Sequence, residues 1–502
     1  MANTILILGN GFDLAMKRKT SYEDFLRFID YFYIINKLGG ANVSDSDINE
    51  SVDRVKAQFN DCFSFVLGEN VELLEYFRNL TVEEIIILFQ NSIIEVLHKE
   101  NDDFQIVFPE FLNPKLHSWM GEFGEDLIDE VQGRIATKQI PIKIEEVEKC
   151  FSEGLSFGVL NRASKYNLYI DFIRSNKSKL GRNWSSIELV IADLVEALSD
   201  IKENLQDYYA LIKIEKNLSY IDIRNLSYSI ENFRHKSNYE AFKFILENLE
   251  REFENSPDLS DVQLINNLNE KLVTDLKILT GLLELYLFYI SKVDFESEKI
   301  SKSKTVLDAI QSIKESKVIN FNYTDTAWKL FDIPYVNTHY IHGKIEQNRH
   351  KNSLNTMVFG IEDKDDEVES INSDLIPFQK FYQRTVKETG NDFELFFKPT
   401  KYNDMKHGIY SVGKIYPKNI IVFGHSVDPL DKEIFRKCFN LAEKGGYQYQ
   451  FLFCYYNESA KLSIVKNLAI ILGKNKLIEL TGKNKIKFIK YDDVNRMKKE
   501  LY

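Results

Sequence analysis

The feature that most limits the fold of this chain is its first strand-like segment. Thr4 to Leu8 is an uninterrupted apolar run, typical of a strand that is buried on both faces of a parallel sheet. The chain then turns at Gly9-Asn10-Gly11, and a helix-like segment follows from about Asp13. A buried strand needs hydrogen-bonded neighbours, and the next strand-like segments begin only at Val318. We therefore predict one sheet that is assembled from both ends of the chain.

The C-terminal part of the chain supplies the missing strands. Short apolar segments alternate there with helix-like segments, which indicates a mostly parallel sheet. The predicted strands are 318–321, 335–341, 357–359, 420–423, 451–455 and 486–489, and the predicted helices are 457–472 and 492–501. The fold class is therefore α/β, and residues 1–27 and 313–502 are expected to form one domain.

Residues 28–312 are predicted to be a large all-helical insertion in that domain. Apolar residues recur in steps of three and four from Ile187 to Leu205 and again from Leu268 to Leu287, which predicts two long amphipathic helices. Ser185 and Glu188 fit a capping box at the start of the first helix. We expect the insertion to act as a lid over the site or as the interface of a homo-oligomer.

Charge and cysteine usage exclude several classes of protein. The chain has 64 basic and 76 acidic residues, a formal net charge of −12, which argues against broad nucleic-acid binding. Its four cysteines form no CxxC pair, which argues against a cysteine zinc site and against a disulfide framework. The apolar stretch 279–290 is about half the length that spans a bilayer, and the start of the chain does not look like a signal peptide. We expect a cytoplasmic protein that does not enter the membrane.

Polar residues follow four of the predicted strands, and ligands of open parallel sheets bind beyond the carboxyl ends of strands. The four motifs are Gly9-Asn10-Gly11-Phe12-Asp13, Asn320-Phe321-Asn322-Tyr323-Thr324-Asp325, His342-Gly343 and Gly424-His425-Ser426-Val427-Asp428. Taken singly, each has a structural explanation: a tight turn, a helix cap, a structural histidine, or an N-cap before proline. Their convergence at one edge of the sheet favours a nucleotide site.

Each motif offers a distinct kind of chemistry. Glycines after the first strand let the backbone approach a phosphate. Asn322 offers both a donor and an acceptor, which suits a ribose or a carboxamide. His342, where the chain leaves the sheet, is well placed as a general base. Gly424 and Ser426 would supply a further close contact to the nucleotide.

Together with two further segments, these motifs resemble the AbiH family of bacterial phage abortive-infection proteins. The further segments are Lys19-Thr20-Ser21-Tyr22-Glu23-Asp24-Phe25-Leu26 and the helix start Trp184…Glu188. The resemblance spans nearly the whole chain. It implies an anti-phage protein that responds to a phage trigger, which the sequence does not identify.

More distantly, the order of the motifs resembles the Rossmann-like, sirtuin-type NAD-binding fold. On this resemblance Gly9, Asn10 and Gly11 match the turn that binds the pyrophosphate. Asn322 matches the residue that orders ribose and water, and His342 matches the general base. Gly424 and Ser426 match residues on the adenosine side. The chain lacks the four-cysteine zinc module of deacylases, Asn10 replaces an alanine, and Thr324 is inserted before Asp325. The resemblance therefore implies NAD hydrolysis rather than deacylation.

The function predicted from the sequence is that of an NAD glycohydrolase that needs no metal. The predicted catalytic residues are Asn322, His342 and Asp325, with Asp325 or Asp13 stabilising a cationic ribose. The predicted nucleotide-binding residues are Gly9, Asn10, Gly11, Phe12, Asp13, Tyr323, Gly343, Gly424, His425, Ser426 and Asp428, with Trp184 and Glu188 contributed by the insertion.

Two other functions fit the same residues. A binding module could hold NAD or ADP-ribose without hydrolysing it and signal through the helices. A nuclease would need clustered carboxylates for magnesium, for which Asp363, Asp365 and Asp366 are the candidates.

Overall fold

The structure is a computed structural model of the chain. It describes residues 4–29, 71–81, 84–85, 87–88, 124–137, 167–176, 184–215, 238–345, 356–361, 373–406 and 409–501. Two compact units are present: residues 1–22 with 168–502, and residues 23–167. The predicted boundaries, 1–27 with 313–502 and an insertion over 28–312, remain a prediction.

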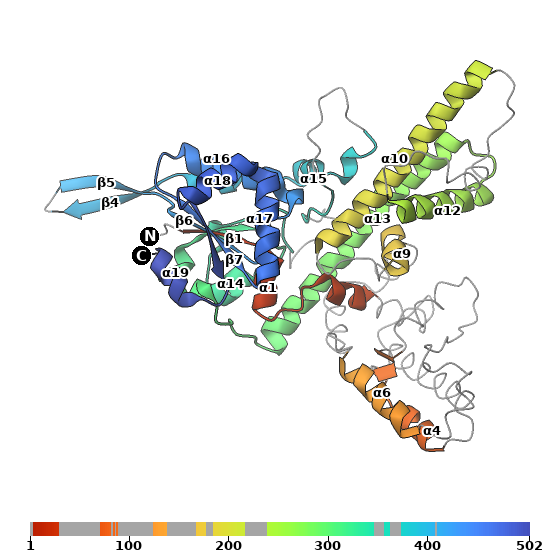
Figure 1. Ribbon diagram of the computed structural model, residues 1–502, viewed down its shortest axis with the longest axis horizontal. Coiled ribbons are helices and arrows are strands. Elements are labelled where there is room, and N and C mark those ends of the chain that lie inside the picture. Colours follow the sequence, from red (N-terminus) through yellow and green to blue (C-terminus); the bar gives the residue numbers. More distant parts are fainter. Residues whose placement is uncertain are drawn as a thin grey trace. The chain divides into compact units, whose positions relative to one another are not determined.

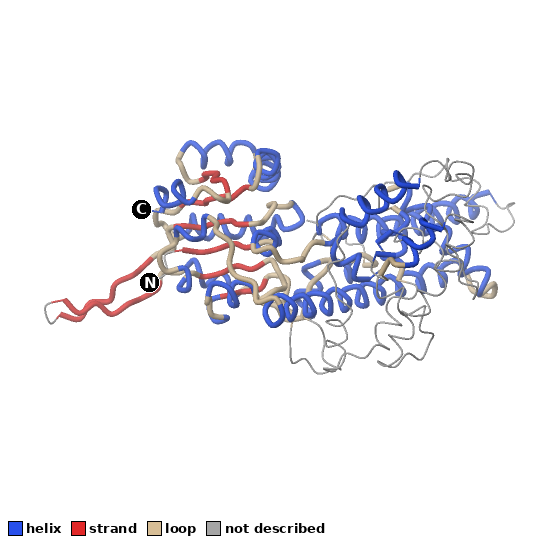
Figure 2. Tube along the Cα trace, turned by 90° about the horizontal axis from the view of Figure 1, so that it is seen from below, coloured by secondary structure: helices blue, strands red, loops and turns tan. Residues whose placement is uncertain are grey.

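The first unit contains a six-stranded sheet in the order β3-β2-β1-β6-β7-β8. Figure 1 labels three of its strands, β1, β6 and β7. The strands are β1 Thr4–Leu8, β2 Lys317–Asn320, β3 Thr338–Tyr340, β6 Asn419–Phe423, β7 Gln450–Tyr455 and β8 Ile486–Lys490. Every neighbouring pair in this sheet is parallel, and Figure 2 shows the strands side by side. The prediction of an α/β fold with a mostly parallel sheet is confirmed.

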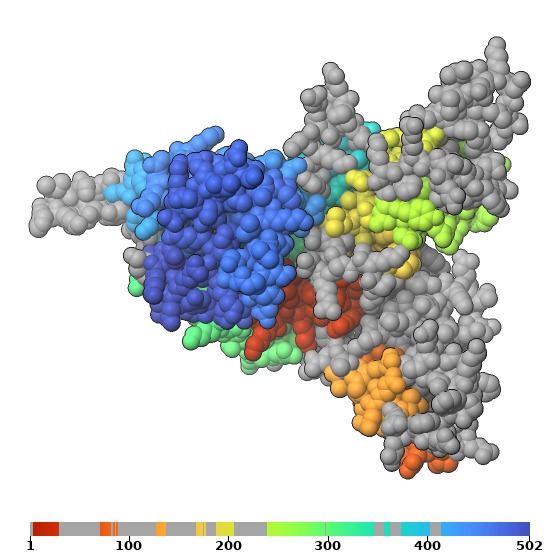
Figure 3. Space-filling view, in the orientation of Figure 1, coloured from red at the N-terminus to blue at the C-terminus, as the bar shows by residue number. Residues whose placement is uncertain are grey.

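β1 lies between two strands that are distant in the sequence. Leu8 is in register with Asn320 of β2 on one side and with Phe423 of β6 on the other. All five residues of β1 are buried, as the apolar run predicts. Figure 3 shows the N-terminal segment, in red, directly against the blue C-terminal segment. The prediction that the two ends of the chain share one sheet is therefore confirmed.

Helices cover both faces of the sheet. Alternate residues of β1 point to opposite faces, so Ile5 and Ile7 join one core and Leu6 and Leu8 join the other. The first core contains residues of α16 (Lys432–Lys444), α17 (Glu458–Leu472) and α18 (Lys474–Gly482). The second contains residues of α1 (Asn10–Ala15), α14 (Thr326–Phe331) and α19 (Val494–Leu501). The result is a sheet between two helical layers.

The strand order places a topological switch point at the centre of the sheet. From β1 the chain moves outward through β2 to β3, and it then crosses to the other side of β1 to form β6, β7 and β8. The connections that leave β1 and β6 therefore run to opposite faces of the sheet, and the edge beyond these two strands is the usual ligand site of such sheets. A two-stranded antiparallel hairpin, β4 (Thr400–Lys406) with β5 (Ile409–Ile415), precedes β6.

The described part of the first unit also contains four α-helices between α1 and β2. They are α9 (Leu168–Ser175), α10 (Trp184–Glu215), α12 (Tyr239–Asn255) and α13 (Asp261–Lys292), which continues into a π-helical turn, η4 (Val293–Ser297). The apolar stripes predicted on α10 and α13 are buried wherever their side chains are described. The second unit contains α4 (Val71–Arg78) and α6 (Gly124–Thr137). Among the described residues, no helix is both long and apolar enough to cross a membrane.

Four local predictions differ from the structure. The first helix was expected from about Asp13, but α1 begins at Asn10, directly after its N-cap Gly9. Segment 335–341 was expected to be one strand, but η7, a 3-10 turn over Tyr335–Asn337, precedes β3 because Pro334 fixes the backbone before it. Segment 357–359 forms no strand, although Val358 donates a backbone hydrogen bond to His342. α10 begins at Trp184, so Ser185 lies inside the helix instead of capping it.

Candidate functional site

A pocket of about 970 Å³ lies beyond the carboxyl ends of the strands. All six strands of the sheet are followed by residues that line it. These are Gly9, Asn10 and Gly11 after β1, Phe321 to Thr324 after β2, His342 after β3, Gly424 to Ser426 after β6, Tyr456 and Asn457 after β7, and Tyr491 after β8. The pocket therefore lies where the strand order predicts a ligand site.

Most of the residues predicted for the site line this pocket. They are Gly9, Asn10, Gly11, Asp13, Glu188, Asn322, Tyr323, His342, Gly424, His425, Ser426 and Asp428. Phe12, Asp325 and Gly343 are not among the lining residues. Phe12 belongs to the core, and Asp325 precedes α14 and accepts a hydrogen bond from Tyr335. The side chain of Trp184 lies outside the described residues.

The turns after β1 and β6 are in direct backbone contact at the centre of the pocket. The Gly11 amide donates to the Gly424 carbonyl at 2.7 Å. Gly424 has a φ of +70°, and a Cβ atom there would lie 2.0 Å from the backbone nitrogen of Phe12. Glycine is therefore required at position 424, both for its backbone conformation and for the close approach of the two turns.

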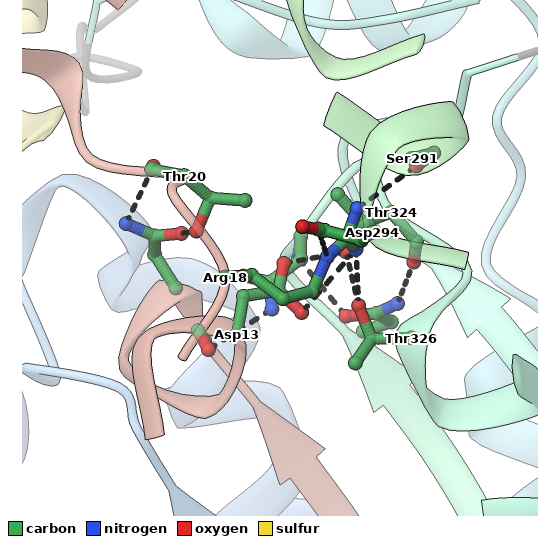
Figure 4. Close-up of polar contacts among 11 residues, drawn as sticks. Asp13, Arg18, Thr20, Ser291, Asp294, Thr324 and Thr326 are labelled. Carbon is green, nitrogen blue, oxygen red and sulfur yellow. Dashed lines mark hydrogen bonds and ion pairs between the residues drawn. The ribbon is translucent and has the colours of Figure 1, made fainter. Parts of the chain in front are cut away.

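Asn10 uses its side chain to hold the next loop in place. Its amide nitrogen donates to the Thr20 carbonyl at 3.1 Å, and the Thr20 hydroxyl donates to its amide oxygen at 2.9 Å (Figure 4). Thr20 and Ser21 also line the pocket. The predicted pyrophosphate turn is thus braced by its own asparagine side chain.

Asp13 belongs to a buried network around Arg18, which Figure 4 shows. The Thr324 hydroxyl donates to Asp13 at 2.5 Å, and the Arg18 guanidinium lies 3.9 Å from the other oxygen of Asp13. Arg18 also donates to Asp294 at 2.6 Å, to Thr326 at 2.5 Å and to Ser291 at 2.9 Å. Burial raises the pKa of Asp13, and the charge of Arg18 opposes that shift. The Arg18 cation is thus shared by the carboxylates of Asp13 and Asp294.

Asn322 joins the end of β2 to the turn after β1. Its side-chain nitrogen donates to the Gly9 carbonyl at 3.0 Å, and its backbone amide donates to the side chain of Asn320 at 3.0 Å. The side chain is 7% exposed. Its side-chain nitrogen is thereby fixed, and the residue lines the pocket.

Two histidines of the pocket share one carboxylate. The Nε2 atom of His342 lies 3.1 Å from Asp431, and the Nε2 atom of His425 lies 3.5 Å from its other oxygen. Asp431 ends η11 (Pro429–Asp431), the short turn that follows Asp428. The Nδ1 atom of His425 accepts from the Val427 amide at 2.8 Å, so the proton of His425 is on Nε2, toward Asp431.

A buried lysine connects this carboxylate to a second one. The ammonium of Lys380, at the start of α15 (Lys380–Val386), lies 3.1 Å from Asp431 and 3.0 Å from Glu188 of α10. Burial by itself would raise the pKa of Asp431, but Lys380 and His342 outweigh it and hold that pKa well below its usual range. Burial raises the pKa of Glu188 to about 7, although Lys380 lowers it. Asp431 is therefore ionised at neutral pH, and Glu188 titrates there.

His342 is held as a neutral base. Burial lowers its pKa to about 4, against the attraction of Asp431. Its Nε2 atom donates to the Asp431 carboxylate, which leaves Nδ1 as the acceptor, and that atom has no hydrogen-bond partner in the described part of the chain. The ring of Phe321 packs against both histidine rings, with ring centroids 5.5 Å apart for His342 and 4.3 Å apart for His425. Carboxylate and aromatic ring together fix the orientation of His342.

Analysis of the sequence missed Asp431, Lys380 and the tyrosines at the other side of the pocket. Tyr456 and Tyr491, whose ring centroids are 4.9 Å apart, follow β7 and β8. Asp431 could have been found, because it lies in the same segment as the predicted Asp428. Lys380 carries no sequence signal, since it comes from a helix with no recognisable motif.

The fold and the pocket define an α/β protein with a pocket at the switch point of a parallel sheet. The family model described as bacteriophage abortive infection AbiH matches residues 159–453, more than half of the 502 residues. The chain therefore belongs to the AbiH family, as its motifs indicated. The comparison with curated proteins and the comparison with solved structures found no match. Glu188, Asn322, His342, Lys380 and Asp431 all lie within the matched residues.

Proposed function

We propose that this AbiH-family protein acts in abortive infection by binding NAD in the pocket and hydrolysing its nicotinamide–ribose bond. His342 is the general base, and Asn322 orients the ribose or the attacking water. The observation that carries the proposal is the state of His342. It is neutral and hydrogen-bonded through Nε2 to Asp431, and its Nδ1 atom is buried and has no hydrogen-bond partner among the described residues.

Hydrolysis of the nicotinamide–ribose bond requires a water molecule and a base that takes its proton. A water oxygen forms a bond to C1′ of the ribose while the bond from C1′ to the nicotinamide nitrogen breaks, and neutral nicotinamide leaves with the bonding electron pair. The proton of the water passes to Nδ1 of His342. Assistance of this kind is worth about 10²–10⁴ in rate. Because the pKa of His342 is lowered to about 4, the base form is present throughout the neutral range.

The strand order supports a dinucleotide as the ligand. His342 follows β3 and Tyr456 follows β7, which is four strands away in the sheet. At 4.7–4.9 Å per strand, the two sides of the pocket are about 19 Å apart. The glycine turns after β1 and β6 lie between them. The nicotinamide half would lie at His342, the pyrophosphate at the glycines, and the adenine at the paired rings of Tyr456 and Tyr491.

The charged partner of the reacting ribose differs from the one predicted from the sequence. Asp13 shares the Arg18 cation with Asp294 in a buried network, and Asp325 does not line the pocket. The carboxylates beside His342 are Asp431 and, beyond Lys380, Glu188. We assign the electrostatic role to these two carboxylates.

A second candidate is the non-catalytic nucleotide sensor, and one observation favours it. Arg18 hydrogen-bonds to Ser291 on α13 and to Asp294 in the turn after it. In the sequence, Arg18 shortly precedes Thr20 and Ser21, which line the pocket. A ligand that moves this loop would therefore act on the end of α13. Tight binding of NAD without release of nicotinamide would favour this candidate.

For the nuclease, no observation adds support. Asp363, Asp365 and Asp366 lie outside the described residues. Within the described ranges, no group of three or more His, Cys, Asp or Glu side chains could hold a metal ion.

The test of the proposed function is a comparison of two buried histidines. His342→Ala and Asn322→Ala proteins are expected to release nicotinamide from NAD at least about 100-fold more slowly than the wild type. His339→Ala is the matched control, because His339 lies in β3 just before His342, is equally buried and does not line the pocket. Folding of each variant is checked by its thermal midpoint. Release at the wild-type rate from folded His342→Ala protein would refute the assignment of the base.

A further inference from the structure

Glu188 comes from a helix outside the sheet and lines the pocket. A chain of charged groups connects it to His342. The carboxylate of Glu188 lies 3.0 Å from the ammonium of Lys380, which lies 3.1 Å from Asp431, which in turn lies 3.1 Å from His342. Only 3% of the Lys380 side chain is exposed, against 13% for Glu188 and 11% for Asp431. These four side chains, which we call the charge relay, come from α10, α15, η11 and the end of β3.

The charges of the charge relay do not sum to zero. It contains two carboxylates and one ammonium, and its imidazole is neutral, so with Glu188 ionised it carries one net negative charge. The groups that face Glu188 are Lys380, Asp431, Asp428 and Tyr323, of which only Lys380 attracts its negative charge. A buried charge without a full counter-charge is unfavourable. In the ligand-free protein the effect is a raised pKa of Glu188, about 7.

We propose that Glu188 is the specificity-determining residue of this pocket, and that it selects ligands with a positive charge on the group that enters beside His342. For a nicotinamide dinucleotide, this means the oxidised pyridinium ring and not the neutral reduced ring. The inference rests on the proposed function. The charge that the relay lacks is the charge that the pyridinium supplies, and a counter-charge within about 4–8 Å at an effective dielectric constant of ~20 is worth more than tenfold in affinity.

Glu188 is suited to this role because it is not needed to orient the base, His342. His342 is oriented by Asp431, and Lys380 keeps a carboxylate partner in Asp431 when Glu188 is changed. Replacement by glutamine keeps the size of the side chain and an oxygen that accepts from Lys380. The variant therefore removes the net charge and leaves the bonded partners of the base unchanged.

The experiment measures binding, not turnover. Calorimetric titration of His342→Ala protein with oxidised and with reduced NAD gives the ratio of the two affinities. We expect the oxidised form to bind at least about tenfold more tightly, and the ratio to fall to within about twofold when Glu188→Gln is added. Glu203→Gln is the control, because Glu203 lies on the same helix, is exposed and does not line the pocket.

A second measurement keeps the inference testable if the Glu188 variant fails to fold. In the His342→Ala protein, the preference for the oxidised form is expected to grow as the pH rises from 6 to 8, since Glu188 loses its proton in that window. Lys380 stays protonated there and Asp431 stays ionised, because their pKa values are raised and lowered, respectively, out of the window. A ratio near one at every pH, or a ratio unchanged by Glu188→Gln, overturns the inference and leaves the proposed function standing. Failure of both forms to bind overturns the proposed function, and the inference with it.

Discussion

Asp431→Asn is the change that tests the arrangement of the site most sharply. Asp431 accepts from His342 at 3.1 Å and from Lys380 at 3.1 Å, and it lies 3.5 Å from His425. Asparagine has the same shape but no charge, and its one amide oxygen is a weaker acceptor for His342 and Lys380, which both donate to the same oxygen of Asp431. The substitution therefore leaves the base in place and removes the negative charge that orients it and stabilises its protonated form.

The expected loss follows from these contacts. Replacing the carboxylate that orients a catalytic histidine by an amide lowers kcat by up to about 10⁴ in serine proteases. Here the ring of Phe321 still restrains His342, so we expect a loss of about 10²–10⁴, or ~3–5 kcal/mol in activation free energy. Lys380 keeps Glu188 as a partner, so the loss of folding free energy should stay below the ~3–5 kcal/mol of a fully unpaired buried charge.

The assay is the rate of nicotinamide release at several NAD concentrations, which separates kcat from KM. The account predicts that Asp431→Asn lowers kcat far more than it raises KM, because the carboxylate acts on the base and not on the bound nucleotide. Asp492→Asn, in an exposed ion pair with Lys490, is the control and should match the wild type. A folded Asp431→Asn protein with the kcat of the wild type would refute this role of Asp431.

Three further predictions follow from other parts of the structure. Gly424→Ala should abolish nucleotide binding and lower the unfolding midpoint in urea, because its Cβ would lie 2.0 Å from the Phe12 nitrogen; Gly446→Ala, with a similar φ of +64° and open space around it, should cost only about 1 kcal/mol, and equal losses would contradict the argument. Arg18→Met should lower the free energy of unfolding by about 3–5 kcal/mol, because it leaves Asp13 and Asp294 buried without their cation, whereas Lys483→Met removes only an exposed pair and should cost at most about 1 kcal/mol; similar urea midpoints for the two variants would be the contrary result. In Glu188→Gln protein, which lacks the carboxylate that titrates near pH 7, the pH profile of kcat/KM should fall on the acid side only near pH 4, because the pKa of His342 is lowered to about 4 and the base keeps its lone pair above that value; a fall near the ordinary histidine pKa of about 6.5 would count against His342 as the base.

The sheet and the edge that carries the pocket could be predicted from the sequence because their signals are local. The run from Thr4 to Leu8 has no polar side that could face water, so it had to be a central strand. Parallel strands bring their carboxyl ends to one edge, so the motifs after them were expected to meet, and Asn322, His342 and Gly424 do line one pocket.

The partners of these residues could not be predicted, because they depend on packing between distant segments. Nothing in the sequence around Lys380 distinguishes it from the many solvated lysines of the chain, and only the fold brings it between Glu188 and Asp431. Asp325 was expected at the site because it follows β2 closely, but it immediately precedes α14 and contacts Tyr335 instead. Distance along the chain from a strand end does not determine the direction of a side chain.

The most direct test of the central claim is to incubate the purified protein with NAD and quantify free nicotinamide and ADP-ribose by chromatography, with the His342→Ala protein in parallel. The account predicts that both products appear in equal amounts with the wild type and that neither accumulates with the variant. Equal rates from the two proteins would contradict His342 as the base. Intact NAD that stays bound to the wild type would contradict hydrolysis and favour the nucleotide sensor.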